Sequence, residues 1–184
     1  MKPVSLILAC TYDGGIGYKN RIPWYIPEEL KKFATISKSV NDKTKKNAVI
    51  MGRRTWQSIS EPLPGRINIV ISASGFLKSC NSENVHYVSS IEDALNFCET
   101  SDDIEKAFII GGASIYNEFI FYKHCDIYLS VLFYNDYKTD RKININMLFA
   151  NYVLTKDDRY ENEHMNRKFA SYICKPRILQ DHTT

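Results

Sequence analysis

The segment Pro23–Phe33 carries the acidic residue with the most distinctive surroundings in this sequence. Pro27 stands where a helix would begin, and Glu28 and Glu29 complement the positive end of that helix, which is by itself a sufficient structural role. Glu29 and Phe33 are four residues apart, so they share one helix face. If that face points inward, Glu29 is a carboxylate in an apolar cleft. Such a group has a raised pKa and can hold a cationic or proton-accepting heterocycle.

Two segments combine glycines with the end of a predicted strand. Asp13–Trp24 contains three glycines, which suit a sharp turn or a close approach to a ligand. Their spacing is not that of the GxGxxG dinucleotide fingerprint, and a plain turn is the simpler interpretation. In Ala107–Tyr116, a buried strand ends in Gly111-Gly112 and a helix starts at once. This order places backbone N–H groups at the carboxyl end of a sheet strand, where α/β proteins bind phosphates.

Three arginines lie at the ends of predicted strands. Arg53 and Arg54 follow a strand and open a short helix, an arrangement that suits a pyrophosphate or a ribose phosphate. Arg66 follows the Pro64-Gly65 turn at the entry of a buried strand. A guanidinium at the rim of a cleft there can clamp a carboxylate with two parallel hydrogen bonds. Solvated surface arginines are the alternative in both places.

The elements that must position these residues form an alternating pattern. Apolar runs alternate with short helical patterns, which predicts a single-domain α/β fold with a mostly parallel central sheet and helices on both faces. Strands are expected at Val4–Thr11, Ala48–Met51, Ile67–Ser72, Val85–Val88, Ala107–Ile110 and Asp126–Phe133. Helices are expected at Glu28–Ser37, Arg54–Ile59, Ile91–Cys98 and Ser114–Phe121.

The last third of the chain is expected to close the sheet with an antiparallel strand pair. Tyr152–Tyr160 and Lys168–Lys175 both alternate apolar and polar residues. The domain is expected to cover residues 1–175, with the adenosine side of a cofactor at about 47–105 and a tail at 176–184. Surface connections are expected at Lys38–Asn47, Ser74–Glu83 and Thr100–Glu105.

Composition and charge exclude several classes of protein. The chain has 184 residues, of which 44% are apolar and 24% charged, as in soluble globular domains. A net charge of +3 with interspersed signs gives no basic patch for nucleic acid. Five cysteines without a CxxC pair and four histidines without metal spacing predict reduced thiols and no metal site. We therefore expect a cytoplasmic protein, and no apolar run is long enough for a membrane span.

Taken in order, these segments resemble the dihydrofolate reductase family. The family's Ile-Gly followed by Pro-Trp-x-x-Pro-x-[Asp/Glu]-Leu-x-x-Phe is matched within Ile16–Phe33, and Met-Gly-Arg-x-Thr-Trp-x-Ser-Ile at Met51–Ile59. Leu-Pro-x-Arg-x-Asn is matched at Leu63–Asn68, and Ile-Gly-Gly-x-x-x-Tyr at Ile110–Tyr116. The ordered set is highly specific and spans about residues 4–133. It implies NADPH-dependent reduction of 7,8-dihydrofolate to 5,6,7,8-tetrahydrofolate, in support of thymidylate and one-carbon metabolism.

The resemblance also implies roles for individual residues. Glu29 would be the active-site acid, bonded to the hydroxyl of Ser130, where the family usually has threonine. The substrate and antifolate inhibitors would contact Ile7, Leu8, Glu29, Phe33, Ile59, Leu63, Arg66, Ile110 and Tyr116, with Arg66 on the glutamate carboxylate. NADPH would contact Ala9, Ile16, Gly17, Asn20, Gly52, Arg53, Arg54, Thr55, Ser72, Ala73, Gly111, Gly112, Ala113, Ser114, Ile115 and Tyr116.

In the implied mechanism, Glu29 raises the proton affinity of the pterin while water delivers the proton, and the loop Asp13–Trp24 closes over the nicotinamide. Two departures from the family pattern bear on this. Ala73 and Ser114 replace polar or basic contacts to the cofactor's 2′-phosphate, a change that nearby arginines can offset. The family's Asp-Thr-x-Phe-Pro stretch has only Asp140–Asn144 as a counterpart, so residues 134–150 are poorly placed.

Three other functions compete with this reading. A pyrimidine-type reductase of riboflavin synthesis would lack the set of Trp24, Glu29 and Phe33. A non-catalytic nucleotide-binding module would need no pairing of Glu29 with Arg66, and a nucleic-acid binder would cluster its basic residues. The protein is expected to be a monomer if the chain is complete, or fused to thymidylate synthase if it is not.

Overall fold

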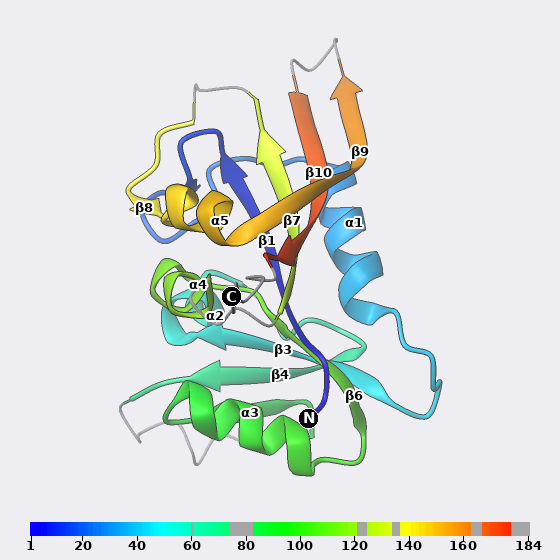
Figure 1. Cartoon of the computed structure of the whole chain (residues 1–184). Helices are drawn as coiled ribbons and strands as arrows, with labels where there is room; N and C mark the ends of the chain where they lie inside the picture. The colour runs from blue at the N-terminus through cyan, green and yellow to red at the C-terminus, as the bar shows by residue number, and fades with distance from the viewer. Residues whose placement is uncertain (60, 74–82, 121–124, 134–136, 163–166, 178–184) are drawn as a thin grey trace, which may run out of the picture.

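An eight-stranded sheet in the order β5-β4-β3-β6-β1-β7-β10-β9 forms the centre of the molecule (Figure 1). The computed structural model describes residues 1–59, 61–73, 83–120, 125–133, 137–162 and 167–177. The strands are β1 (Val4–Thr11), β3 (Lys46–Gly52), β4 (Arg66–Ile71), β5 (Val85–Val88), β6 (Ile104–Ile109), β7 (Asp126–Leu132), β9 (Tyr152–Asn162) and β10 (Arg167–Pro176). From β5 to β7 all neighbours are parallel, whereas β10 is antiparallel to both β7 and β9. The predicted mostly parallel sheet with an antiparallel end is therefore confirmed.

Five helices accompany the sheet in the described ranges: α1 (Pro27–Lys38), α2 (Arg53–Ser58), α3 (Ile91–Thr100), α4 (Ala113–Ile120) and α5 (Ile145–Asn151). Strands β1 and β5 have the predicted bounds, and the other predicted elements differ by a few residues at their ends. Ile104 and Glu105, expected in a surface connection, belong to β6, in which Ile104 pairs with Lys46 of the neighbouring strand β3. Most of the predicted connection Ser74–Glu83 and most of the predicted tail 176–184 lie outside the described residues. Pro176, expected in that tail, is the last residue of β10.

Three elements were not predicted. Gly15–Gly17 forms β2 and pairs antiparallel with β8 (Arg141–Lys142). The Asp140 N–H also donates to the Gly17 carbonyl oxygen at 2.9 Å. Three residues are too few to show a strand pattern in the sequence. The strand forms through its pairing with β8, which lies more than a hundred residues away. Helix α5 carries a readable signal that the prediction missed: the Asn144 side chain caps it by accepting from the Met147 N–H at 3.1 Å.

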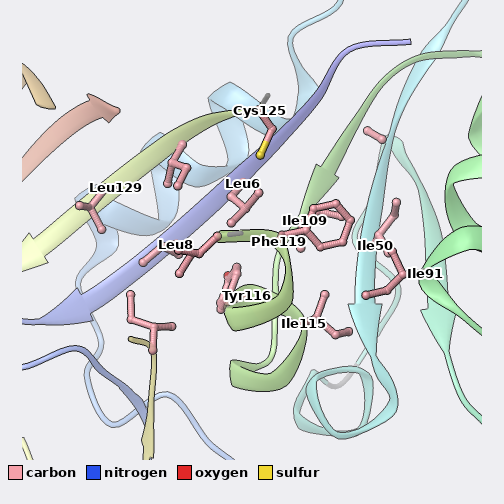
Figure 2. Packing of buried hydrophobic residues seen from close by; sticks show 14 of the residues in the cluster. Leu6, Leu8, Ile50, Ile91, Ile109, Ile115, Tyr116, Phe119, Cys125 and Leu129 are labelled. Atoms are coloured by element: carbon pink, nitrogen blue, oxygen red, sulfur yellow. The ribbon is translucent and has the colours of Figure 1, made fainter. Parts of the chain in front are cut away.

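The alternation of β1 explains why helices cover both faces of the sheet. Leu6, Leu8 and other even-numbered residues of β1 pack with α3 and α4, and Figure 2 shows Leu6 near Phe119 and Leu8 near Tyr116. Ile7 points to the opposite face, where it belongs to a cluster with partly buried side chains of α1 and α2. The helices on both faces are thus placed as predicted.

The described cysteines Cys10, Cys98, Cys125 and Cys174 are buried free thiols. His86 packs against Phe97 with ring centroids 4.5 Å apart, while the other three histidines and Cys80 lie outside the described residues. Among the described residues, no cluster of His, Cys, Asp or Glu could hold a metal ion. No helix in that part of the chain has both the length and the apolar character needed to cross a membrane.

Candidate active site

A cleft of about 720 Å³ lies at the edge of the sheet where the parallel strands β1, β3, β4 and β6 end. Because these strands are parallel, their carboxyl ends share one edge of the sheet, which is where α/β folds bind ligands. Helices α1, α2 and α4 and the segment 16–24 complete the walls. The cleft thus collects side chains from segments that are far apart in the sequence.

Nearly all the predicted site residues line this one cleft. On the predicted substrate side these are Ile7, Leu8, Glu29, Phe33, Ile59, Leu63, Ile110 and Tyr116. Every residue of the predicted cofactor set lines it as well: Ala9, Ile16, Gly17, Asn20, Gly52, Arg53, Arg54, Thr55, Ser72, Ala73, Gly111, Gly112, Ala113, Ser114, Ile115 and Tyr116. Two predicted residues, Ser130 and Arg66, are not part of the cleft wall. Ser130 contacts Glu29 and Arg66 contacts Phe33, and both of these partners line the cleft.

Glu29 occupies the first turn of α1 and is 8% exposed. Pro27 starts the helix, and the preceding Ile26 is buried, which fixes the helix against the sheet. The Ser130 hydroxyl on β7 donates a hydrogen bond to the Glu29 carboxyl group. Burial raises the pKa of Glu29 to about 7, and the hydrogen bond from Ser130 opposes this rise. The structure therefore presents a carboxyl group that changes charge near neutral pH and faces a cleft.

This burial predicts a pH-dependent cost in stability. The unfolded Glu29 ionises near its ordinary value of 4.5, whereas the folded group keeps its proton until about pH 7. Stability therefore falls as the pH rises between these values, by about 3 kcal/mol at most. We expect the free energy of unfolding of Glu29→Gln, relative to that of the wild type, to rise by that amount between pH 4 and pH 8. Urea unfolding at each pH measures it. A difference between the two proteins that does not change with pH would contradict the raised pKa.

Tyr116 on α4 closes the floor of the cleft. Its hydroxyl donates to the Ile7 carbonyl oxygen at 2.7 Å, and burial raises its pKa far above the ordinary value, so it stays neutral. The neighbouring Gly111 has φ +121°, and a Cβ there would come within 3.2 Å of the Tyr116 ring. Gly111 also accepts from the Gly52 N–H at 2.8 Å, which joins the ends of β3 and β6. Glycine is required at this turn for both its conformation and its space.

Arg66 is more deeply buried than the sequence predicted. A position at the rim of the cleft was expected, but the residue is 3% exposed and does not line the cleft. Its Nη1 donates to the Ser37 hydroxyl at 2.7 Å and its Nε to the Pro64 carbonyl oxygen at 3.2 Å. The guanidinium lies 5.6 Å from the ring centroid of Phe33, which does line the cleft. The physical reason for the difference is this anchoring to α1, which a sequence motif does not reveal.

Several cleft residues were missed by the sequence-based assignment: Arg21, Ile22, Trp24, Leu30, Ser58, Ile71 and Arg141. Most of them are next in the sequence to residues that were assigned, so they could have been predicted as neighbours of the site. Trp24 was noted in a motif, yet its contact with Tyr137, at 5.5 Å between ring centroids, was not foreseeable. Arg141 reaches the cleft only because β8 pairs with β2, and no local signal could have found it.

Comparisons with known proteins agree with this geometry. The family described as dihydrofolate reductase matches residues 3–174. The chain is 44% identical over 121 residues to a dihydrofolate reductase of Candida albicans, covering 64% of this chain and 61% of that protein. It is 38% identical over 165 residues to a bifunctional dihydrofolate reductase-thymidylate synthase of Paramecium tetraurelia, covering 89% and 32%.

A second bifunctional relative comes from Arabidopsis thaliana, where bifunctional dihydrofolate reductase-thymidylate synthase 2 is 42% identical over 134 residues. That match covers 68% of this chain and 24% of the relative. The chain thus spans about a quarter of the length of such plant relatives.

Proposed function

This chain belongs to the dihydrofolate reductase family, and on that premise we propose that it reduces 7,8-dihydrofolate to 5,6,7,8-tetrahydrofolate with NADPH as hydride donor. The observation that carries the proposal is the buried carboxyl group of Glu29 in the wall of the cleft, with a pKa near 7. A group of this kind can hold the amino and ring N–H groups of a pterin. An apolar floor and walls, including Ile7 and Phe33, would cover the two faces of its ring.

Glu29 would act on the proton rather than on the hydride. Reduction of the pterin imine needs a proton at nitrogen, and an ionised carboxylate bound to the same ring raises the affinity of that nitrogen for a proton. A water molecule would deliver the proton, because the Ser130 hydroxyl is already committed to Glu29. Tyr116 would remain neutral and keep the main chain of Ile7 in place, through its hydrogen bond to the Ile7 carbonyl oxygen.

The residues of the cleft fit a dinucleotide cofactor. Arg53 and Arg54, just after β3, offer positive charge to its phosphates. Gly112 lines the same wall, and a Cβ there would come within 3.2 Å of the Thr55 hydroxyl, so glycine keeps the main chain accessible. When bound, NADPH supplies the hydride; the chain orients the two reactants and excludes water.

We expect a preference for NADPH over NADH that grows at low salt. Arg53 and Arg54 are exposed side chains, so their attraction for the 2′-phosphate is screened by added ions. The measurement is kcat/KM for both cofactors at two ionic strengths. Equal values for the two cofactors would show that Ala73 and Ser114, where the family often has polar or basic contacts, have removed the discrimination.

The direct test of the activity is a spectrophotometric assay of NADPH oxidation with and without dihydrofolate. We expect oxidation only when dihydrofolate is present. Oxidation at the same rate without the pterin, or none with it, would contradict the proposal.

The relatives differ in whether they carry a second activity, and the gene's full reading frame distinguishes the two arrangements. A thymidylate synthase sequence in frame after Thr184 would make this unit one part of a bifunctional protein, as the names of the plant and Paramecium relatives describe. A stop codon there would make it a separate reductase, as the name of the Candida relative describes.

A further inference from the structure

On the sheet face that meets α1, a pair of serines on β7 and β10 lies between two pairs of apolar or aromatic residues. Ser130 on β7 lies directly opposite Ser171 on β10. Residues two apart along a strand share a face, so the neighbouring pairs lie on the same side. Those pairs are built from large apolar or aromatic side chains: Leu132 with Phe169, and Tyr128 with Ile173. The two serine hydroxyls therefore form a small polar island.

The two hydroxyls differ in their hydrogen bonding. Ser130 donates to the carboxyl group of Glu29, whereas the Ser171 hydroxyl has no partner within the part of the chain that the structure describes. Ser171 is 2% exposed, so bulk solvent does not satisfy it. Buried polar groups are nearly always hydrogen-bonded, by ordered water where protein groups are lacking. Opposed residues of an antiparallel pair have Cβ atoms about 5 Å apart, a spacing that one water molecule can bridge.

We propose that Ser171 is a positioning residue for Glu29: its hydroxyl and that of Ser130 hold a buried water molecule that hydrogen-bonds to the carboxyl group on the side away from the cleft. This inference rests on the proposed role of Glu29 in the reaction. The water would donate to the ionised carboxylate and so favour the charged form, against the effect of burial. Ser171 would thereby help set the pH at which Glu29 loses its proton.

The other groups around Glu29 leave room for this effect. Among the described residues, the titratable group with an electrostatic interaction with Glu29 is Tyr116 on α4, which burial keeps neutral. Ser130 on β7 donates a hydrogen bond to Glu29, which lowers the pKa of the carboxyl group. Burial, which raises that pKa, is the larger influence. A change at Ser171 should therefore be visible in the titration of Glu29 without interference from a neighbouring charge.

The test is a carbon NMR titration of the Glu29 carboxyl group in the full chain, with the signal assigned by its absence in Glu29→Gln. We expect Ser171→Ala to raise the pKa of Glu29 by about 0.5–1 pH unit, the size expected for losing one hydrogen bond. Ser171→Thr keeps the hydroxyl and should keep the wild-type titration. Ser5→Ala, a half-buried serine on the neighbouring strand β1, is the matched control and should also change nothing.

Two outcomes would overturn the proposal. An unchanged titration in Ser171→Ala, together with a higher melting temperature, would show that the hydroxyl is simply an uncompensated buried group. An equal shift in Ser171→Thr would show that packing, not the hydroxyl, governs Glu29. Because the titration needs no turnover, a shift confined to Ser171→Ala in a chain without reductase activity would contradict the proposed function and leave this inference standing.

Discussion

Glu29→Gln is expected to lower turnover at neutral pH by roughly 10²-fold or more, the usual scale for losing an acid–base contribution. The amide keeps the shape of the side chain and can still accept the hydrogen bond from Ser130. It cannot carry the negative charge that supports protonation of the pterin. The measurement is kcat with saturating NADPH and dihydrofolate near pH 7.

Glu28→Gln is the matched control for this prediction. Glu28 is the neighbouring acid in the same first turn of α1 but does not line the cleft. It should lose little activity, since its carboxylate complements the helix end and lies outside the lining of the cleft. If the two variants were equally active, the assignment of Glu29 as the active-site acid would be wrong.

Arg66→Lys should separate ligands by whether they carry a glutamate carboxylate. In the structure, Ser37 and Pro64 hold two of the guanidinium nitrogens, and Nη2 has no partner among the described protein atoms. An arginine fixed in this way can bind a carboxylate with directed hydrogen bonds, whereas lysine offers a point charge. A charge-assisted bond is worth about 1.5–3 kcal/mol, so dihydrofolate and methotrexate should bind roughly 10- to 150-fold more weakly.

Trimethoprim-like diaminopyrimidines lack that carboxylate and should bind Arg66→Lys almost as they bind the wild type. The deciding quantity is the ratio of inhibition constants for the two inhibitor classes in each protein. The burial of Arg66 offers a competing role, because its bond to Ser37 ties α1 to β4. If both classes weaken by the same factor, Arg66 supports the structure and does not bind the ligand.

The parts of the fold that the sequence predicted are those with strong local patterns. β1 was recognised because Val4–Thr11 contains the unbroken apolar run Leu6–Cys10, as expected for a strand covered on both faces. Helix α1 was recognised because Pro27 and two acidic residues mark its start. The ordered motifs placed most of the lining of the cleft. Two of them, Met51–Ile59 and Ile110–Tyr116, lie at or just after the carboxyl ends of the parallel strands β3 and β6.

The parts that escaped prediction depend on contacts between distant segments. β2 exists through its pairing with β8, and Arg141 joins the cleft for the same reason. Arg66 is buried because Ser37, twenty-nine residues earlier, accepts its hydrogen bond. Ser171 stands opposite Ser130 only through the register of β10 with β7. Register and side-chain burial of this kind follow from tertiary packing, and a single sequence contains no local signal for them.

The most direct test of the central claim is to follow the hydride itself. The protein is mixed with dihydrofolate and NADPH that carries deuterium at both C4 positions, and the pterin product is analysed by mass spectrometry. We predict tetrahydrofolate that contains one deuterium per molecule, formed in equal amount to the NADPH consumed. Product without deuterium, or consumption of NADPH without tetrahydrofolate, would contradict direct hydride transfer between the two ligands in this cleft.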